Sequence, residues 1–150
     1  GHGWAQADSH LALPVDDRPL ETILSDDASP YAWLGRGDAP LSAVMPAHIR
    51  YTAVDEQPAG FSRIWLTDIL RGRLGFEGVV ISDDLAMAGA AIYEDVADRA
   101  QVAFEAGCDA TLICNRPDLS IRALDELPRR MPAFLTAPAR RSLARLLPDA

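Results

Sequence analysis

The sequence predicts an α/β fold with a parallel sheet. Short apolar runs at 41–45, 78–81 and 110–114 are typical of buried strands. Helical patterns follow each run, and strands that alternate with helices at this spacing indicate right-handed βαβ units covered on both faces. Three strands form either a small open sheet or the later part of a (β/α)8 barrel, which takes about 250 residues. The chain starts at Gly1 rather than Met, which favours a barrel whose N-terminal half is absent.

The composition excludes several other classes of protein. The chain has 150 residues, of which 49% are hydrophobic and 24% charged, enough for one globular core. Its net charge is −8, so no nucleic-acid partner is expected. The longest apolar stretch, 85–93, is too short to cross a bilayer, and no membrane partner is expected. Cys108 and Cys114 cannot form a disulfide framework, which favours a reduced, cytoplasmic protein.

The first half of the chain moves from loops to regular structure. Residues 1–40 are rich in Gly, Pro, Asp and Ser, which leaves room for short helices only at 20–24 and 31–34. The run 41–45 is a predicted strand because Pro46 stops it.

The middle of the chain predicts a helix and then a strand. Ser62 is a suitable N-cap for a helix that extends to about Arg71, and Gly72 and Gly75 provide its end. The strand at 78–81 is β-branched and uncharged.

The last part predicts a helix at 95–106 that closes at Gly107, then the strand at 110–114 and helices at about 119–127 and 137–147. A group of arginines here is expected to form the solvated side of the terminal helices. Its members are Arg129, Arg130, Arg140, Arg141 and Arg145.

Polar residues follow all three predicted strands, the third of which ends at Asn115 and Arg116. Because loops at the carboxyl ends of parallel strands converge, chemistry is expected there. Asp83 and Asp84 come directly after the strand at 78–81, and either is a functional candidate. The alternative is a cap for the next helix, which suits Asp84 better. His48 faces the same edge or is a hydrogen-bonded structural histidine.

A second candidate lies near the start of the chain. Asp8 precedes His10 by two residues in a loop, and a carboxylate beside an imidazole fixes its tautomer for proton transfer. Asp8, His10, His48 and Asp83 do not have metal-ligand spacing, and no His-Glu-x-x-His or Cys-x-x-Cys motif occurs. No metal, cofactor or nucleotide is therefore expected.

Five motifs carry a family resemblance. They are Gly1-His2-Gly3, Asp8-Ser9-His10, Val44-Met45-Pro46-Ala47-His48, Gly75-Phe76-Glu77-Gly78-Val79-Val80-Ile81-Ser82-Asp83-Asp84-Leu85-Ala86-Met87, and Ala106-Gly107-Cys108-Asp109. In this order they resemble bacterial β-N-acetylhexosaminidases of glycoside hydrolase family 3, which release N-acetylglucosamine during peptidoglycan recycling. The resemblance covers about 1–127. The Asp-x-His loop separates this branch from the β-glucosidases of the family.

The resemblance implies a TIM-barrel enzyme of which this chain is the C-terminal part of the catalytic domain. Residues 1–40 would then be a catalytic loop and connecting segment, 41–127 the βα units and 128–150 a C-terminal helical extension. In the family the first Asp of the Ser-Asp-Asp motif is the nucleophile, which corresponds to Asp83. The loop histidine is the general acid/base, which corresponds to His10, with Asp8 as its partner.

The resemblance also implies pocket residues. His2 belongs to the end of a longer motif, Lys-His-Phe-Pro-Gly-His-Gly, whose sugar-binding Lys and first His are absent from this chain. Met45 and His48 are expected to line or support the pocket.

The implied function is retaining hydrolysis that removes terminal β-linked N-acetylglucosamine from muropeptides or chitooligosaccharides. One alternative is a family 3 β-glycosidase or glycoside phosphorylase of other specificity. Another is a non-catalytic half barrel that acts as a binding or structural module. The isolated fragment itself is expected to be inactive.

Overall fold

A computed structural model describes residues 3–35, 40–132 and 144. The elements before residue 62 have two to six residues each, and the longer helices come after it. In chain order they are β1 (Val15–Asp16), α1 (Leu20–Ser25), α2 (Ser29–Leu34), β2 (Ala43–Val44), β3 (Arg50–Tyr51), the 3-10 helix η1 (Ala59–Phe61), the π-helix η2 (Ile64–Arg73), β4 (Val79–Asp84), the 3-10 helix η3 (Ala88–Ala90), α3 (Val96–Ala106), β5 (Ala110–Leu112) and α4 (Pro117–Arg130).

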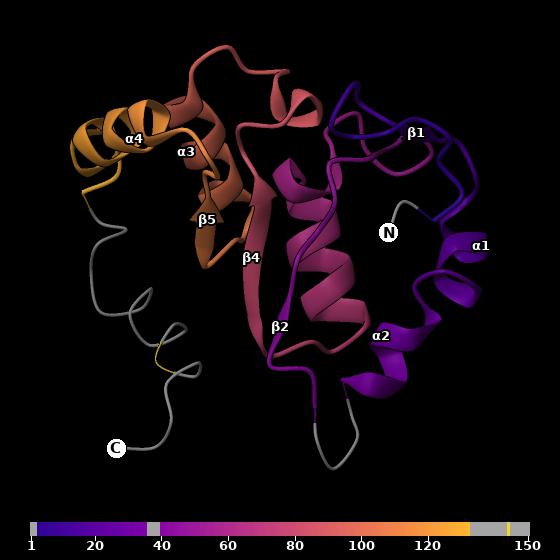
Figure 1. Cartoon of the computed structure of the whole chain (residues 1–150). Coiled ribbons are helices and arrows are strands. Elements are labelled where there is room, and N and C mark those ends of the chain that lie inside the picture. Colours follow the sequence, from indigo (N-terminus) through magenta and orange to yellow (C-terminus); the bar gives the residue numbers. More distant parts are fainter. Residues whose placement is uncertain (1–2, 36–39, 133–143, 145–150) are drawn as a thin grey trace.

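The three predicted strands form one parallel sheet in the order β2-β4-β5. Figure 1 shows α3 and α4 beside β5, with the segment that holds α1 and α2 beyond β2. The parallel α/β fold predicted from the sequence is confirmed. A separate parallel pair, β1 with β3, was not predicted, because two-residue strands leave no periodic pattern.

Strand β4 is the buried centre of the sheet. Val79 and Val80 are fully buried, and β4 continues through Ser82 to Asp84 rather than ending at residue 81. The acidic residues are therefore the last positions of the central strand itself. Packing on both sides of β4 fixes where they lie.

The helix after Ser62 forms at the expected place with a different geometry. Ser62 Oγ accepts a hydrogen bond from the Trp65 backbone N–H (3.1 Å), as an N-cap does. The Leu74 N–H donates to the Ile69 carbonyl five residues earlier (2.8 Å), which is the π-helical pattern. The helix also runs through Gly72 to Arg73, so the predicted end at Arg71 was too early.

Helix α3 matches its prediction closely. Asp95 caps it by accepting a hydrogen bond from the Ala97 N–H (3.0 Å), and Gly107 ends it with a φ of 126°, a conformation that favours glycine. The Asp95 carboxylate also binds Arg122 of α4 (2.8 Å), and this hydrogen bond is the main reason why the pKa of Asp95 is lowered.

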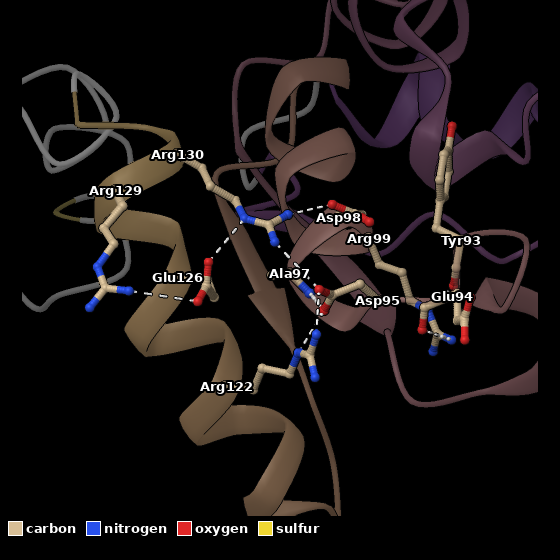
Figure 2. Close-up of polar contacts among 10 residues, drawn as sticks. All are labelled: Tyr93, Glu94, Asp95, Ala97, Asp98, Arg99, Arg122, Glu126, Arg129 and Arg130. Carbon is tan, nitrogen blue, oxygen red and sulfur yellow. Dashed lines mark hydrogen bonds and ion pairs between the residues drawn. The ribbon is translucent and has the colours of Figure 1, made fainter.

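The contacts of Arg130 correct one expectation about the arginine group. Arg130 forms ion pairs with Asp98 and, at 3.4 Å, with Asp95, so it joins α4 to α3 instead of facing solvent alone (Figure 2). Arg129 pairs within α4 with Glu126 (3.7 Å). The helix predicted at 137–147 lies outside the described residues except for Ala144, as do Arg140, Arg141 and Arg145. No helix within the described ranges is long and apolar enough to span a membrane.

Candidate active site

The carboxyl end of β4 holds two carboxylates with different contacts. Asp83 Oδ1 accepts a hydrogen bond from the Asp84 backbone N–H (2.8 Å). Asp84 Oδ1 accepts two, from the N–H groups of Ala86 and Cys114 (2.9 Å each). The Asp84 side chain therefore ties the turn after β4 to the end of β5. These contacts leave Asp83 as the carboxylate with fewer backbone partners.

His48 is completely buried beneath this strand end. Its Nε2 lies 3.1 Å from the Asp84 carbonyl oxygen, so Nε2 carries the proton and donates it. Its buried Nδ1 has no hydrogen-bond partner in the part of the chain that the structure describes. Burial lowers the pKa of His48, while the Asp84 carbonyl and the carboxylates of Asp83 and Asp84 oppose that shift less strongly. His48 is thus a neutral support for the strand, which matches its structural interpretation.

Asp83 and Met45 both line a cavity of about 520 Å³. Met45 is exposed, at 51% of its residue surface. The rest of the lining is largely apolar and includes Tyr51, Trp65 and Leu66. A concave apolar site with a carboxylate among its lining groups is the usual form of a small-molecule pocket.

The predicted Asp8–His10 pair forms. Asp8 Oδ1 lies 2.8 Å from His10 Nδ1 and also accepts a hydrogen bond from the His10 backbone N–H (2.9 Å). Their side chains are 53% and 70% exposed. Since a carboxylate can only accept a hydrogen bond, Nδ1 carries a proton and Nε2 is the ring atom left to face a ligand.

A backbone contact joins the two groups of candidates. Ser9, between Asp8 and His10, is buried, and its carbonyl accepts a hydrogen bond from the Gly89 N–H (2.9 Å). A Cβ on Gly89 would lie 2.9 Å from His48 Cβ and 3.1 Å from the Ser9 oxygen. Only glycine allows this approach without movement of a neighbour.

The structure therefore connects five of the six predicted site residues to one region. Asp83 and Met45 share the cavity, His48 supports the strand, and His10 with Asp8 lies on the loop that Gly89 holds. His2 lies outside the described residues. Gly89 was not singled out from the sequence, since its role depends on segments far away along the chain.

Neither cysteine lies in a disulfide, and they differ in burial. Cys108 is buried and Cys114 exposed, and both are free. The described ranges contain no group of three or more His, Cys, Asp or Glu side chains arranged to hold a metal ion.

Comparison with known proteins gives consistent matches. Residues 1–133 match the N-terminal domain of glycosyl hydrolase family 3. The chain is 56% identical to a β-hexosaminidase of Bordetella parapertussis over 145 residues and 55% identical to one of Bordetella avium over 148. These alignments cover 97% and 99% of this chain but 40% of each relative, so the chain spans about two fifths of their length.

Solved structures of related proteins also match the chain. NagZ from Neisseria gonorrhoeae in complex with N-trifluoroacetyl-D-glucosamine has a TM-score of 0.77 and 44% identity, covering 97% of this chain and 40% of that one. A family 3 β-N-acetylglucosaminidase from Paenibacillus sp. str. FPU-7 has a TM-score of 0.84 and 34% identity, covering 97% and 28%. On this sequence match and this shared fold, the chain belongs to glycosyl hydrolase family 3.

Proposed function

We propose that the protein containing this chain is a retaining glycosidase that releases terminal, non-reducing β-linked N-acetylglucosamine. The observation that carries the proposal is the position of Asp83, which lines a cavity at the carboxyl end of the central parallel strand. The names of the relatives support the substrate class, since they are β-hexosaminidases and one solved relative holds an N-acylated glucosamine.

Asp83 is proposed as the nucleophile. A retaining glycosidase needs a carboxylate that attacks the anomeric carbon and forms a covalent glycosyl ester. Asp84 uses its side chain to hold Ala86 and Cys114, whereas Asp83 accepts the Asp84 N–H through one oxygen. These contacts support Asp83 over Asp84 in this role.

His10 is proposed as the general acid/base. With Asp8 bonded to Nδ1, the Nε2 atom can donate a proton to the leaving oxygen and later accept one from water. The exposure of this pair supports a loop that closes over bound substrate, because an acid/base group must be shielded from bulk water during reaction. Met45 and His2 are proposed as pocket residues.

The chain is further proposed to be the C-terminal half of a (β/α)8 barrel. The parallel order β2-β4-β5 and the 40% coverage of the relatives support this arrangement. The isolated chain is then expected to lack activity, which belongs to the full-length protein. Muropeptides in the cytoplasm are the proposed physiological substrate, and digestion of purified muropeptides tests it.

Covalent trapping tests the mechanism. The full-length protein is incubated with a slowly reacting fluorinated N-acetylglucosaminyl donor, digested with trypsin and analysed by tandem mass spectrometry. Cleavage at Arg73 and Arg99 gives one peptide, 74–99, that contains both Asp83 and Asp84, so fragmentation must locate the label. We expect it on Asp83. A label on Asp84 or on another peptide rejects the assignment, and release of a glycosyl phosphate in phosphate buffer indicates a phosphorylase instead.

A further inference from the structure

Arg99, near the start of α3, holds the loop that follows β4. Its guanidinium donates three hydrogen bonds to main-chain carbonyls: Nε to Tyr93 (2.7 Å), Nη1 to Leu85 (2.7 Å) and Nη2 to Glu94 (3.2 Å). Figure 2 shows the side chain turned back toward Tyr93 and Glu94, away from the arginines of α4. Among the described residues, no carboxylate forms an ion pair with it.

The Leu85 contact connects Arg99 to Asp83. Leu85 is fully buried and directly follows Asp84, and its N–H donates to the Leu112 carbonyl of β5 (2.9 Å). Both main-chain polar groups of Leu85 are therefore fixed, one by β5 and the other by Arg99. The preceding residue, Asp84, directs its own N–H to the Asp83 carboxylate (2.8 Å). The anchored Leu85 carbonyl thus lies two peptide units beyond the N–H that orients Asp83, and a shift of the main chain at Leu85 would reach that N–H through Asp84.

The chemistry of this anchor requires arginine. A guanidinium is a planar fork whose nitrogens reach several carbonyls at fixed angles, while a lysine ammonium is a compact charge on a flexible chain. A half-buried cation without a carboxylate partner costs free energy unless its donors are satisfied. Here all three bonded donors of Arg99 bind carbonyls in the loop between β4 and α3.

We infer that Arg99 is a positioning residue that fixes the orientation of the Asp83 carboxylate through the Leu85 carbonyl. This inference rests on the proposed glycosidase function. The hydrogen bonds of Arg99 go to main-chain carbonyls, and it acts only through the backbone of 83–85. The expected signature is a loss of kcat without a matching change in KM, since substrate still binds while the nucleophile is misplaced.

The test compares Arg99→Lys with Arg122→Lys in the full-length protein. Arg122 is a matched control because its guanidinium also binds at the start of α3, through the Asp95 carboxylate, but forms none of the hydrogen bonds to the Leu85, Tyr93 and Glu94 carbonyls that Arg99 forms. We expect Arg99→Lys to lower kcat about 10- to 100-fold with KM within about threefold. Arg122→Lys should keep kcat within about twofold. Equal kcat losses in the two variants, or none in Arg99→Lys, overturn the inference.

A measurement that does not need activity separates this inference from the proposed function. Hydrogen exchange at the amides of 84–86 should be faster in Arg99→Lys than in Arg122→Lys at equal global stability. If the unsubstituted protein fails to hydrolyse N-acetylglucosaminides, the proposed function is rejected, and exchange still decides whether Arg99 holds this strand end. If hydrogen exchange at 84–86 is the same in Arg99→Lys and Arg122→Lys, the inference is wrong, whatever the activity of the two variants.

Discussion

The end of β4 and the loop around His10 carry the two proposed reacting groups in opposite ways. The β4 end is held from several sides: His48 bonds the Asp84 carbonyl, and Cys114 bonds its carboxylate. The loop around His10 presents a side chain that is 70% exposed, and its buried point is Ser9. One region is built for a fixed position and the other for access to solvent.

This contrast matches the different requirements of the two groups in a two-step displacement. The nucleophile must stay within bonding distance of one carbon, so a rigid strand end suits it. The proton-transfer group must serve first a leaving group and then a water molecule, so a loop that closes and opens suits it. The hydrogen bond from the Gly89 N–H to the Ser9 carbonyl joins the two regions.

The largest effect is expected at the rigid region. In the full-length protein, Asp83→Asn should lower kcat on the order of 10⁴-fold or more, because the amide cannot form the glycosyl ester. Turnover of a chromogenic N-acetylglucosaminide measures it, and circular dichroism checks that the fold is kept. Near-normal kcat in Asp83→Asn would move the nucleophile to another residue, with Asp84→Asn as the next variant.

A smaller loss is expected at the exposed loop. His10→Ala should reduce kcat by about 10²- to 10⁴-fold, the usual contribution of general acid/base catalysis. Because the side chain is exposed, the midpoint of thermal unfolding should change little. A donor with an activated leaving group that needs no protonation should recover part of the loss in the first step. If activated and unactivated donors lose rate equally, His10 is not the acid.

The link between the regions gives a third test. Gly89→Ala places a Cβ within 2.9 Å of His48 Cβ and 3.1 Å of the Ser9 carbonyl, so a neighbour must move. We expect a stability loss of about 1–3 kcal/mol, typical of an overpacked buried site. Chemical denaturation measures it. Gly35→Ala serves as the control, since its Cβ meets one backbone oxygen at 3.0 Å away from this region. A smaller loss at Gly89 than at Gly35 would contradict the tight packing.

The smallest effect concerns pH and stability. Folding lowers the pKa of His48 below its ordinary 6.5, so the unfolded chain binds a proton that the folded chain resists. This contribution is present above pH 6.5 and is lost as the pH falls through the folded pKa. His48→Gln keeps a donor for the Asp84 carbonyl but cannot be protonated. The free energy of unfolding of this variant should therefore fall less between pH 7 and 5 than that of the unsubstituted protein. Parallel pH profiles would contradict a buried, neutral His48.

Local patterns predicted the elements whose causes are local. The helix at 95–106, its end at Gly107 and the apolar strand at 78–81 are each specified by residues a few positions away at most. The π-helix and the β1–β3 pair escaped prediction because tertiary packing selects them. For the same reason Arg130 was expected to face solvent, although its partners lie on another helix.

The candidate site follows the same division. A carboxylate at the end of the central strand, Asp83 or Asp84, and the Asp8–His10 pair were predicted, since a strand end and a two-residue spacing are visible along the chain. The family resemblance, rather than the position, selected Asp83. The buried position of His48 and the contact at Gly89 depend on three distant segments meeting. A pattern within one segment cannot predict contacts between segments that are far apart along the chain.

The two thiols of this chain differ enough to be told apart by a reagent. Burial raises the pKa of Cys108 to about 12, so little of its thiol is in the reactive thiolate form, and reagents have little access to it. Cys114 is exposed, and its peptide is bonded to the acidic tip of the central strand. A maleimide dye should therefore choose Cys114 over Cys108. Its fluorescence should then change when the proposed N-acetylglucosaminide substrate binds beside Asp83, with no residue of this chain substituted.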